Sequence, residues 1–346
     1  MRPRLAVAVA VVVALCAGCG GTAGLHIEDG GRTVHLRRVA PPKAPPTTHV
    51  HVPATPGVHL GAPAAIAYDA GTLWCAVQPG ARLLGSLVTV DTATGRRVGA
   101  PVPLPPAGRP YLLAVGADGV WLAAGVRLWR IDPTSGKAAV SARLSGPATA
   151  LLDTAGSIWA TVAAPGGGRV VRLDPGSGHR TAEAPVGPSP SALTVAAGSV
   201  WVTDSVEQSI ERFAIHRRAL RSTATIPLPR SSVRAPTQIT VYGGFVWVYE
   251  RGRVLRIGPS SNQVIGTTHV AAVAGGTIAA GSGGIWVITR TRGRGRGAVR
   301  LLDAATGLPL GRRIVVGGHP TAIVTDGRAA WVLDSAAHRL VRVFPD

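Results

Sequence analysis

The sequence predicts an all-β protein, a seven-bladed β-propeller of four-stranded antiparallel blades. Three observations support this: a tryptophan recurs at a nearly constant spacing, each copy follows a short turn, and the last repeat is incomplete. The gaps between successive copies are 47, 38, 42, 46, 39 and 45 residues. Repeats of roughly 40–50 residues built from short strands are typical of propeller blades. The recurring residues are Trp74, Trp121, Trp159, Trp201, Trp247, Trp286 and Trp331.

Each repeat divides into four predicted strands. In Ala192–Ser205 an apolar strand, a glycine turn and a strand that contains Trp201 follow one another. The third strand alternates, with arginines on one face, as in Arg169–Leu173. It ends in a turn such as Asp174–Gly178, whose Asp, Pro and Gly all suit a hairpin. An outer strand such as Arg180–Val186 completes the blade.

The seventh repeat lacks its outer strand. It runs through Trp331 to Arg339–Phe344, and the sequence stops where the next turn is expected. Residues ahead of the first blade offer a replacement, either Thr48–Val52 or Gly57–Leu60. An N-terminal strand that pairs with the last blade would close the ring and remove two open sheet edges.

Composition agrees with one large β domain. Apolar residues make up 46% of the 346 residues, and the 45 Gly and 28 Pro favour many turns between short strands. We divide the chain into a signal peptide at 1–18, a Pro/Gly-rich flexible tether at 19–47 and the propeller at 48–346. The tether contains the run Pro41–Pro46 and is expected to be extended.

The N-terminus has the features of an export signal. Arginines open Met1–Gly18, and the apolar run Leu5–Leu15 is too short for a helix that spans a bilayer. The stretch Cys16-Ala17-Gly18-Cys19 resembles a bacterial lipoprotein cleavage box, which implies that Cys19 is acylated. We therefore expect an exported protein, lipid-anchored to the outer face of the cytoplasmic membrane. An ordinary cleaved signal and a retained N-terminal anchor are the alternatives.

The chain is strongly basic, with a formal net charge of +19. All basic residues except Lys43 and Lys137 are arginine, so part of this charge reflects a composition rich in Ala, Gly, Pro and Arg. Nucleic acid is the usual partner of so basic a chain. An exported protein rarely meets it, and anionic lipid headgroups or wall polymers are better candidates.

Three motifs carry a resemblance to YVTN-type, virginiamycin-lyase-like and NHL-like bacterial propellers. They are Gly198–Asp204, the turn Arg130–Gly136 and Ile314–Pro320. The resemblance covers about residues 48–346 and implies the propeller architecture. It implies no single function, because one fold serves many roles.

Loops between second and third strands gather at one face of a propeller, around the mouth of its central channel. Their candidate ligand-binding residues here are Gln78, Asp204, Glu250, Arg290 and Asp334. Such a set could orient a polar ligand; solvated turn residues are the alternative. The lyases that the chain resembles use a His/Glu set with magnesium on this face. Here no histidine follows a repeat tryptophan, which argues against that chemistry.

The sixth repeat carries an alternating Arg–Gly run. Its arginines, which we assign as a candidate anion-contact loop, are Arg290, Arg292, Arg294 and Arg296. Such a run is flexible and cannot pack a core. On an exported protein it can contact anionic headgroups, at about 1 kcal/mol per basic residue, or it is a solvated insertion.

Other candidate residues have structural interpretations. The repeat tryptophans, each at one fixed place in its blade, are expected to pack between blades rather than to stack sugars. His49 and His51 share one face of a strand, a spacing that can bind metal, but no third ligand is nearby. Cys75 is expected to be a small buried hydrophobe.

These observations predict a binding or scaffold module for a protein or polar ligand, without cofactor or metal, that acts as a monomer. One alternative is a lyase or hydrolase that uses the acidic funnel loops. A second alternative is a nucleic-acid-binding YVTN-type propeller in the cytoplasm.

Overall fold

The computed structural model describes most of the propeller region and two short strands ahead of it. For 28–29, 32–33, 48–51, 60–64, 78–79 and 140 the description is of the backbone alone. The predicted signal peptide, Cys19 and most of the predicted tether lie outside the described residues. The described residues are 28–29, 32–33, 48–51, 60–79, 85–105, 111–116, 119–132, 135–154, 156–229, 235–271, 277–281, 283–291 and 296–345.

By internal contacts the chain divides into two units, Met1–Lys43 and Ala44–Asp346. In the first, β1 (Glu28–Asp29) and β2 (Arg32–Thr33) form a two-stranded antiparallel pair. The second unit is the propeller. Within the described ranges, no helix is long and apolar enough to cross a membrane.

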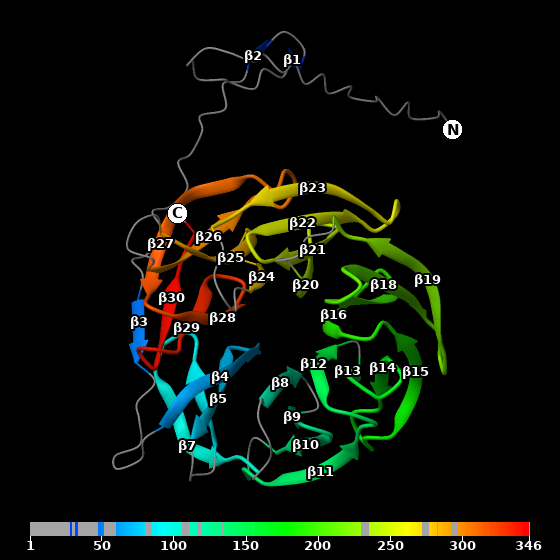
Figure 1. The fold of residues 1–346 in the computed structure, drawn as a ribbon. Helices are drawn as coiled ribbons and strands as arrows, with labels where there is room; N and C mark the ends of the chain where they lie inside the picture. The colour runs from blue at the N-terminus through cyan, green and yellow to red at the C-terminus, as the bar shows by residue number, and fades with distance from the viewer. Residues whose placement is uncertain are drawn as a thin grey trace, which may run out of the picture. The chain divides into compact units, whose positions relative to one another are not determined.

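The second unit is an all-β, seven-bladed propeller, and each blade is a four-stranded antiparallel sheet (Figure 1). In blades 1 to 6 the strands follow one another in chain order, and the first strands of neighbouring blades contact each other around the axis. Blade 1 consists of β4 (Leu60–Asp69), β5 (Thr72–Pro79), β6 (Ser86–Asp91) and β7 (Arg97–Pro103). Blade 2 consists of β8 (Tyr111–Gly116), β9 (Gly119–Ala124), β10 (Arg127–Ile131) and β11 (Ala138–Arg143). Blade 3 consists of β12 (Ala148–Thr154), β13 (Ser157–Val162), β14 (Gly168–Leu173) and β15 (Arg180–Val186).

The remaining blades repeat this order. Blade 4 consists of β16 (Pro190–Ala196), β17 (Ser199–Asp204), β18 (Ser209–Ile215) and β19 (Leu220–Pro227). Blade 5 consists of β20 (Pro236–Tyr242), β21 (Phe245–Glu250), β22 (Arg253–Gly258) and β23 (Gln263–His269). Blade 6 consists of β24 (Ile278–Gly281), β25 (Gly284–Arg290), β26 (Gly297–Leu302) and β27 (Pro309–Gly317). Blade 7 consists of β28 (Pro320–Thr325), β29 (Ala330–Asp334), β30 (Arg339–Val343) and β3 (Thr48–His51).

Blade 7 takes its fourth strand from the N-terminal side of the propeller. Strand β3 pairs antiparallel with β30, with Thr48 opposite Arg342 and His51 opposite Arg339. Of the two segments that the sequence offers for this place, the first is the one that pairs. Leu60, at the end of the second, opens the inner strand of blade 1.

The core lies between blades. Trp121 of blade 2 packs with Ile158 and Ala160 of blade 3, and Trp331 of blade 7 packs with Leu73 and Cys75 of blade 1. Six of the seven repeat tryptophans are less than 2% exposed; Trp74 is half-buried. A buried aromatic side chain removes 150–250 Å² from water, which stabilises the fold by roughly 4–6 kcal/mol. The tryptophans are therefore packing residues, as the sequence predicts.

In blades 1, 3 and 6 the turn between the third and fourth strands is held by an aspartate. Oδ1 of Asp174 accepts hydrogen bonds from the backbone N–H of Ser177 (2.8 Å) and from its hydroxyl (2.7 Å). Gly178 closes the turn at a φ of 71°, where a side chain is strained. The same bonds recur from Thr94 to Asp91 and from Thr306 to Asp303. The serine or threonine hydroxyl and the backbone amides lower the pKa of Asp91, Asp174 and Asp303.

Candidate funnel-face binding site

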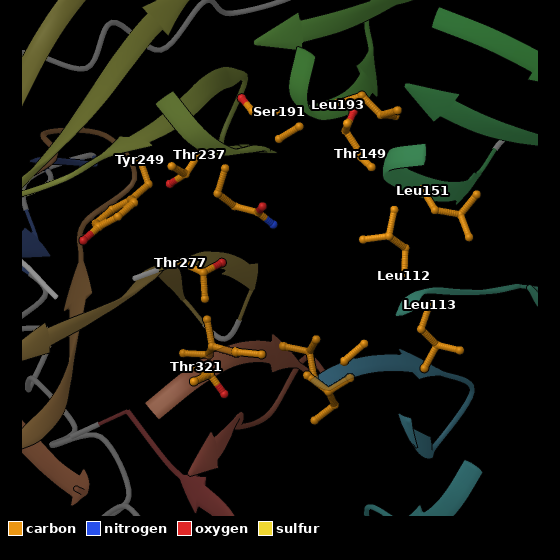
Figure 2. Close-up of a pocket in the computed structure, with 18 of the residues that line it drawn as sticks. Leu112, Leu113, Thr149, Leu151, Ser191, Leu193, Thr237, Tyr249, Thr277 and Thr321 are labelled. Carbon is orange, nitrogen blue, oxygen red and sulfur yellow. The ribbon is translucent and has the colours of Figure 1, made fainter. Parts of the chain in front are cut away.

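A cavity of about 670 Å³ lies on the propeller axis and is lined by residues of all seven blades, from the first strand in six of them and from Thr277, directly ahead of β24, in blade 6 (Figure 2). One side is apolar, with Ile66 of blade 1 and Leu112 and Leu113 of blade 2. The other side carries a hydroxyl from each of five consecutive blades. These five residues, which we call the hydroxyl ring, are Thr149, Ser191, Thr237, Thr277 and Thr321.

A bulge places most of the hydroxyl ring. Where the inner strands of blades 4, 5 and 7 begin, the pairing with the second strand skips one residue directly after a proline. The skipped residues are Ser191, Thr237 and Thr321; blade 3 skips Thr149 in the same way. A bulge leaves its extra residue outside the ladder and re-aims the side chain. Proline suits the preceding position because it has no N–H to pair.

Three members of the ring also bond to neighbouring strands: Thr321 donates to the carbonyl of Leu333 (3.5 Å), and the other two are Thr149 and Ser191. The hydroxyl of Thr149 lies 2.8 Å from that of Thr161 on the second strand of its blade. Ser191 lies 2.9 Å from the hydroxyl of Thr203 and donates to the carbonyl of Pro236 in the next blade (2.7 Å). These bonds hold the hydroxyls in place at the channel wall.

Gln238, Tyr249 and Arg251 of blade 5 add polar groups to the same cavity. Tyr249 is 1% exposed, whereas Arg251 is exposed. Blades 3 to 7 therefore line the channel with five hydroxyls and Arg251 among apolar side chains such as Leu151 and Leu193, while the lining of blades 1 and 2 is mainly apolar.

Asp204 and Asp334 end equivalent strands at this face, but they are buried, at 1% and 0% exposure. Asp204 accepts hydrogen bonds from the backbone N–H groups of Ser189 (2.7 Å), Val206 (2.9 Å) and Glu207 (2.7 Å). They are thus not the solvated turn residues of our alternative interpretation: Asp204 ties the loops at the end of its own blade.

Asp334 does the same in blade 7. It accepts from the N–H groups of Gly318 (3.3 Å) and His319 (3.1 Å), and Arg339 lies 3.5 Å away as an ion pair. Gly317 leaves room for this carboxylate, because a Cβ there would lie 1.8 Å from Oδ2 of Asp334.

Glu250 is also fully buried and forms an ion pair with Arg253, which is 8% exposed. Arg253 in turn donates to the carbonyl of Pro229 in the preceding connection (2.5 Å). The structure therefore brings the three predicted acids to one end of the propeller as separate loop anchors. It does not join them in one cluster.

The other predicted site residues lie elsewhere on this face or beyond the description. Gln78 belongs to β5, with its side chain outside the described residues. Arg290 and Arg296 are exposed at the ends of β25 and β26, and Thr291 donates to the carbonyl of Arg296 (2.9 Å). Arg292 and Arg294 lie outside the described residues.

Arg313, which is half-buried, adds a further cation beside this loop, because it donates to the carbonyl of Arg290 (3.0 Å). Among the residues that the structure describes, no three His, Cys, Asp or Glu side chains are grouped closely enough to hold a metal ion.

Sequence reasoning missed the hydroxyl ring. The signal that could have found it is the recurrence of proline followed by Ser or Thr, just ahead of an inner strand, in blades 4, 5 and 7. The pattern is short and does not show by itself that these residues bulge toward a common axis.

No known family profile matches the chain, and no curated protein matches it in sequence. Solved structures share its fold. The β-propeller domain of Cps50 (Swd1) from Myceliophteria thermophila is 11% identical with a TM-score of 0.61, over 87% of this chain and 100% of that one. The WD40 β-propeller domain of Doa1 is 12% identical with a TM-score of 0.60, over 86% and 97%. The computationally designed protein Ika8 is 14% identical with a TM-score of 0.58, over 83% and 98%. At these identities the likeness shows the fold alone.

Proposed function

We propose that the chain is an exported bacterial lipoprotein of the YVTN/NHL-like propeller type, anchored through Cys19 to the outer face of the cytoplasmic membrane. Its propeller acts as a binding module, and its ligand lies over the channel mouth. The observation that carries the binding role is the hydroxyl ring, five hydroxyl side chains from five blades that line one wall of the cavity.

The chemistry of this face favours a hydroxyl-rich, anionic ligand such as an acidic wall polysaccharide. Hydroxyl side chains and Gln238 can exchange hydrogen bonds with sugar hydroxyls, while Leu112 and Leu113 offer an apolar wall to a ring face. Arg251 at the channel and Arg290 at the rim are exposed cations. Of the nearby buried carboxylates, Glu250 is paired with Arg253 and Asp334 with Arg339, so these two acids are balanced within the protein.

Calorimetric titration with polygalacturonate, and with neutral dextran as control, tests this role. We expect the wild-type chain to bind polygalacturonate and not dextran. Thr237→Val combined with Thr277→Val should weaken that binding at least about fivefold, the equivalent of roughly 1 kcal/mol lost. Thr267→Val, on the outer strand β23, is the matched control and should bind as the wild type does. Binding of neither polymer, or equal binding of both, would reject the ligand class.

The anchor has its own test. After detergent phase partitioning, the wild-type protein should enter the detergent phase and the Cys19→Ser variant should remain in the aqueous phase. The same partitioning for both chains would reject acylation at Cys19.

A second candidate is direct contact of the Arg–Gly loop with anionic lipid headgroups. Arg290 and Arg296, at the two ends of this loop, are both exposed, which favours it. Changing Arg292, Arg294 and Arg296 to Ser should weaken binding to phosphatidylglycerol vesicles and leave polygalacturonate binding largely intact. Unchanged vesicle binding would remove this candidate.

A further inference from the structure

Four blades carry an arginine that lies on the repeat tryptophan. The arginine is the cross-strand partner of the tryptophan, one strand further out. The guanidinium carbon lies 4.5–5.9 Å from the ring centroid, a distance at which a cation is attracted to an aromatic face. The pairs are Trp159 with Arg172, Trp201 with Arg212, Trp247 with Arg256, and Trp331 with Arg342.

In three of these blades the same guanidinium crosses to the next blade. Arg212 of blade 4 donates to the carbonyl of Pro259 (2.6 Å) and to Oδ1 of Asn262 (2.9 Å), both in the third-to-fourth-strand turn of blade 5. Arg172 and Arg256 donate to carbonyls in the equivalent turns of blades 4 and 6. We call this arrangement the arginine staple.

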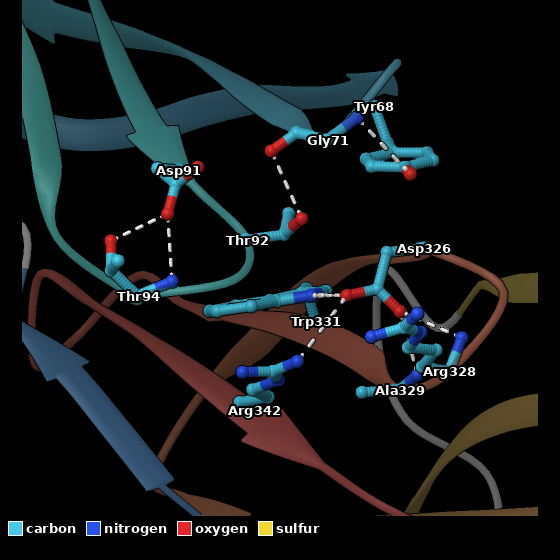
Figure 3. Close-up of polar contacts among 10 residues, drawn as sticks. All are labelled: Tyr68, Gly71, Asp91, Thr92, Thr94, Asp326, Arg328, Ala329, Trp331 and Arg342. Carbon is cyan, nitrogen blue, oxygen red and sulfur yellow. Dashed lines mark hydrogen bonds and ion pairs between the residues drawn. The ribbon is translucent and has the colours of Figure 1, made fainter.

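At the junction of blades 7 and 1, Arg342 covers Trp331 and lies 3.8 Å from Asp326, which also accepts from the indole N–H of Trp331 (2.8 Å; Figure 3). The turn of blade 1 that contains Asp91 lies next to this group in Figure 3. The position opposite the repeat tryptophan is therefore occupied by an arginine in blade 7 as well, at its junction with blade 1.

Blade 1 departs from this pattern. The cross-strand partner of Trp74 is Thr89, which is too short to reach over the indole or into the next blade. Blade 6 also lacks an arginine at this place, but there Leu301 lies opposite Trp286, which is only 1% exposed. Trp74 is instead half-buried, the one repeat tryptophan among the described residues that is not fully covered.

A cleft of about 640 Å³ occupies the place of the missing side chain. Its floor and walls come from blade 1, and the turn of blade 2 lies across it, as the turn of the following blade does at a staple. The cleft residues that matter here are Trp74, Thr89, Asp91, Val102, Ser135 and Gly136. Val98 at the same cleft is 51% exposed, so the opening has an apolar rim.

We propose that this cleft binds an arginine side chain from a partner protein, whose guanidinium stacks on Trp74 in the place that the chain's own arginine occupies in other blades. The site lies between blades 1 and 2, apart from the channel, and goes beyond the proposed function. Trp74 offers the aromatic face. Asp91, whose carboxylate also accepts from Thr94 and is attracted to Arg342 of blade 7, contributes negative charge to the cleft. Val98 and Val102 can pack against the methylene groups of the partner's arginine side chain. A free guanidinium ion has no such groups.

The full chain labelled with 5-fluorotryptophan, followed by fluorine NMR, tests the site directly. Trp74 is assigned by its absence from the Trp74→Phe spectrum. The peptide Gly-Gly-Arg-Gly-Gly should shift the Trp74 signal, and the peptide with Gln in place of Arg should not. Equal shifts from both peptides, or none from either, would overturn the proposal.

Thr89→Arg supplies the missing staple and is the decisive variant. It should fill the cleft, raise the Tm by about 2–4 °C and abolish the shift caused by the arginine peptide. Thr89→Ala, which leaves the cleft open, should retain the shift. A folded Thr89→Arg chain that still responds to the peptide would overturn the proposal.

If Thr89→Arg does not fold, the Trp74→Leu variant is used in its place. The proposal then requires that calorimetric titration shows binding of the arginine peptide at least about fivefold weaker than to the wild type. Sedimentation separates a partner protein from a second copy of this chain. Concentration-dependent dimers of the wild type that Thr89→Arg dissociates would overturn the assignment to a different protein.

Discussion

The guanidinium of Arg212 lies 4.5 Å from the centroid of Trp201 and also bonds two acceptors in the next blade. One residue thus joins two sheets through stacking and hydrogen bonds. Arginine suits this place better than lysine, because its planar group can stack and donate in several directions at once. Part of the net charge of +19 is therefore used inside the fold, in addition to any role toward anionic partners.

Arg212→Ala should lower the free energy of unfolding by about 2 kcal/mol, since it removes a stacked cation and charged hydrogen bonds. Urea unfolding followed by tryptophan fluorescence measures the loss. Arg217→Ala, at an exposed position in the turn of the same blade, is the matched control and should change stability by less than about 0.5 kcal/mol. Equal losses in the two variants would contradict the staple.

Cys75 is fully buried, and burial raises the pKa of its thiol to about 12. The thiolate is the reactive form, so the folded chain should be inert at neutral pH. In a chain with Cys16 and Cys19 changed to Ser, a disulfide reagent should react with Cys75 only after denaturation. Rapid reaction under native conditions would show that the strand β5 is open to solvent.

The blade as a unit was largely predictable from the sequence. The predicted outer strand Arg180–Val186 matches β15, and the inner and tryptophan strands fall where glycine turns and apolar runs placed them. These features depend on local spacing and turn chemistry, which the chain carries within each repeat. The hairpin β1–β2 within the predicted tether was not anticipated.

The candidate site was less predictable, because it depends on contacts between blades. Asp204 stands in a predicted funnel loop, yet its carboxylate turns inward to the amides of Ser189 and Glu207. Thr237 looked like an ordinary strand residue, and only the bulge after Pro236 brings it to the channel. The alternation of apolar and polar residues along a strand predicts on which face of the sheet a side chain lies. It does not predict which hydrogen-bonding groups a neighbouring loop places beside that side chain.

The turn aspartates make the blades sensitive to acid. The hydroxyl and amide of Thr306 hold the pKa of Asp303 below its ordinary value, so the folded state favours the ionised carboxylate. This stabilisation is present above the unfolded pKa of about 3.9 and is lost as pH falls through the lower folded value. At roughly pH 5–7 the Asp303→Asn variant should have a lower Tm than the wild type. The difference between the two Tm values should become smaller below about pH 4. A gap that widens toward acid in calorimetric scans would contradict this sign.

The ring as a whole is completed by a strand from the other end of the propeller sequence. Strand β3 covers the open edge of β30, whose Leu340 and Val341 are fully buried. This completion was predicted from the sequence, because the last repeat lacks its outer strand and a candidate strand precedes the first repeat. The sequence left two segments as candidates, because both are short and both place apolar residues at every second position.

Removal of β3 tests the closed ring most directly. Calorimetry compares chains that begin at Gly20, Ala44 and Pro53. The first two should have the same Tm, while the third, which lacks β3, should melt about 10 °C lower, since an exposed sheet edge and a loosened last blade cost several kcal/mol. The same Tm for the chains that begin at Ala44 and Pro53 would contradict the closed seven-bladed ring.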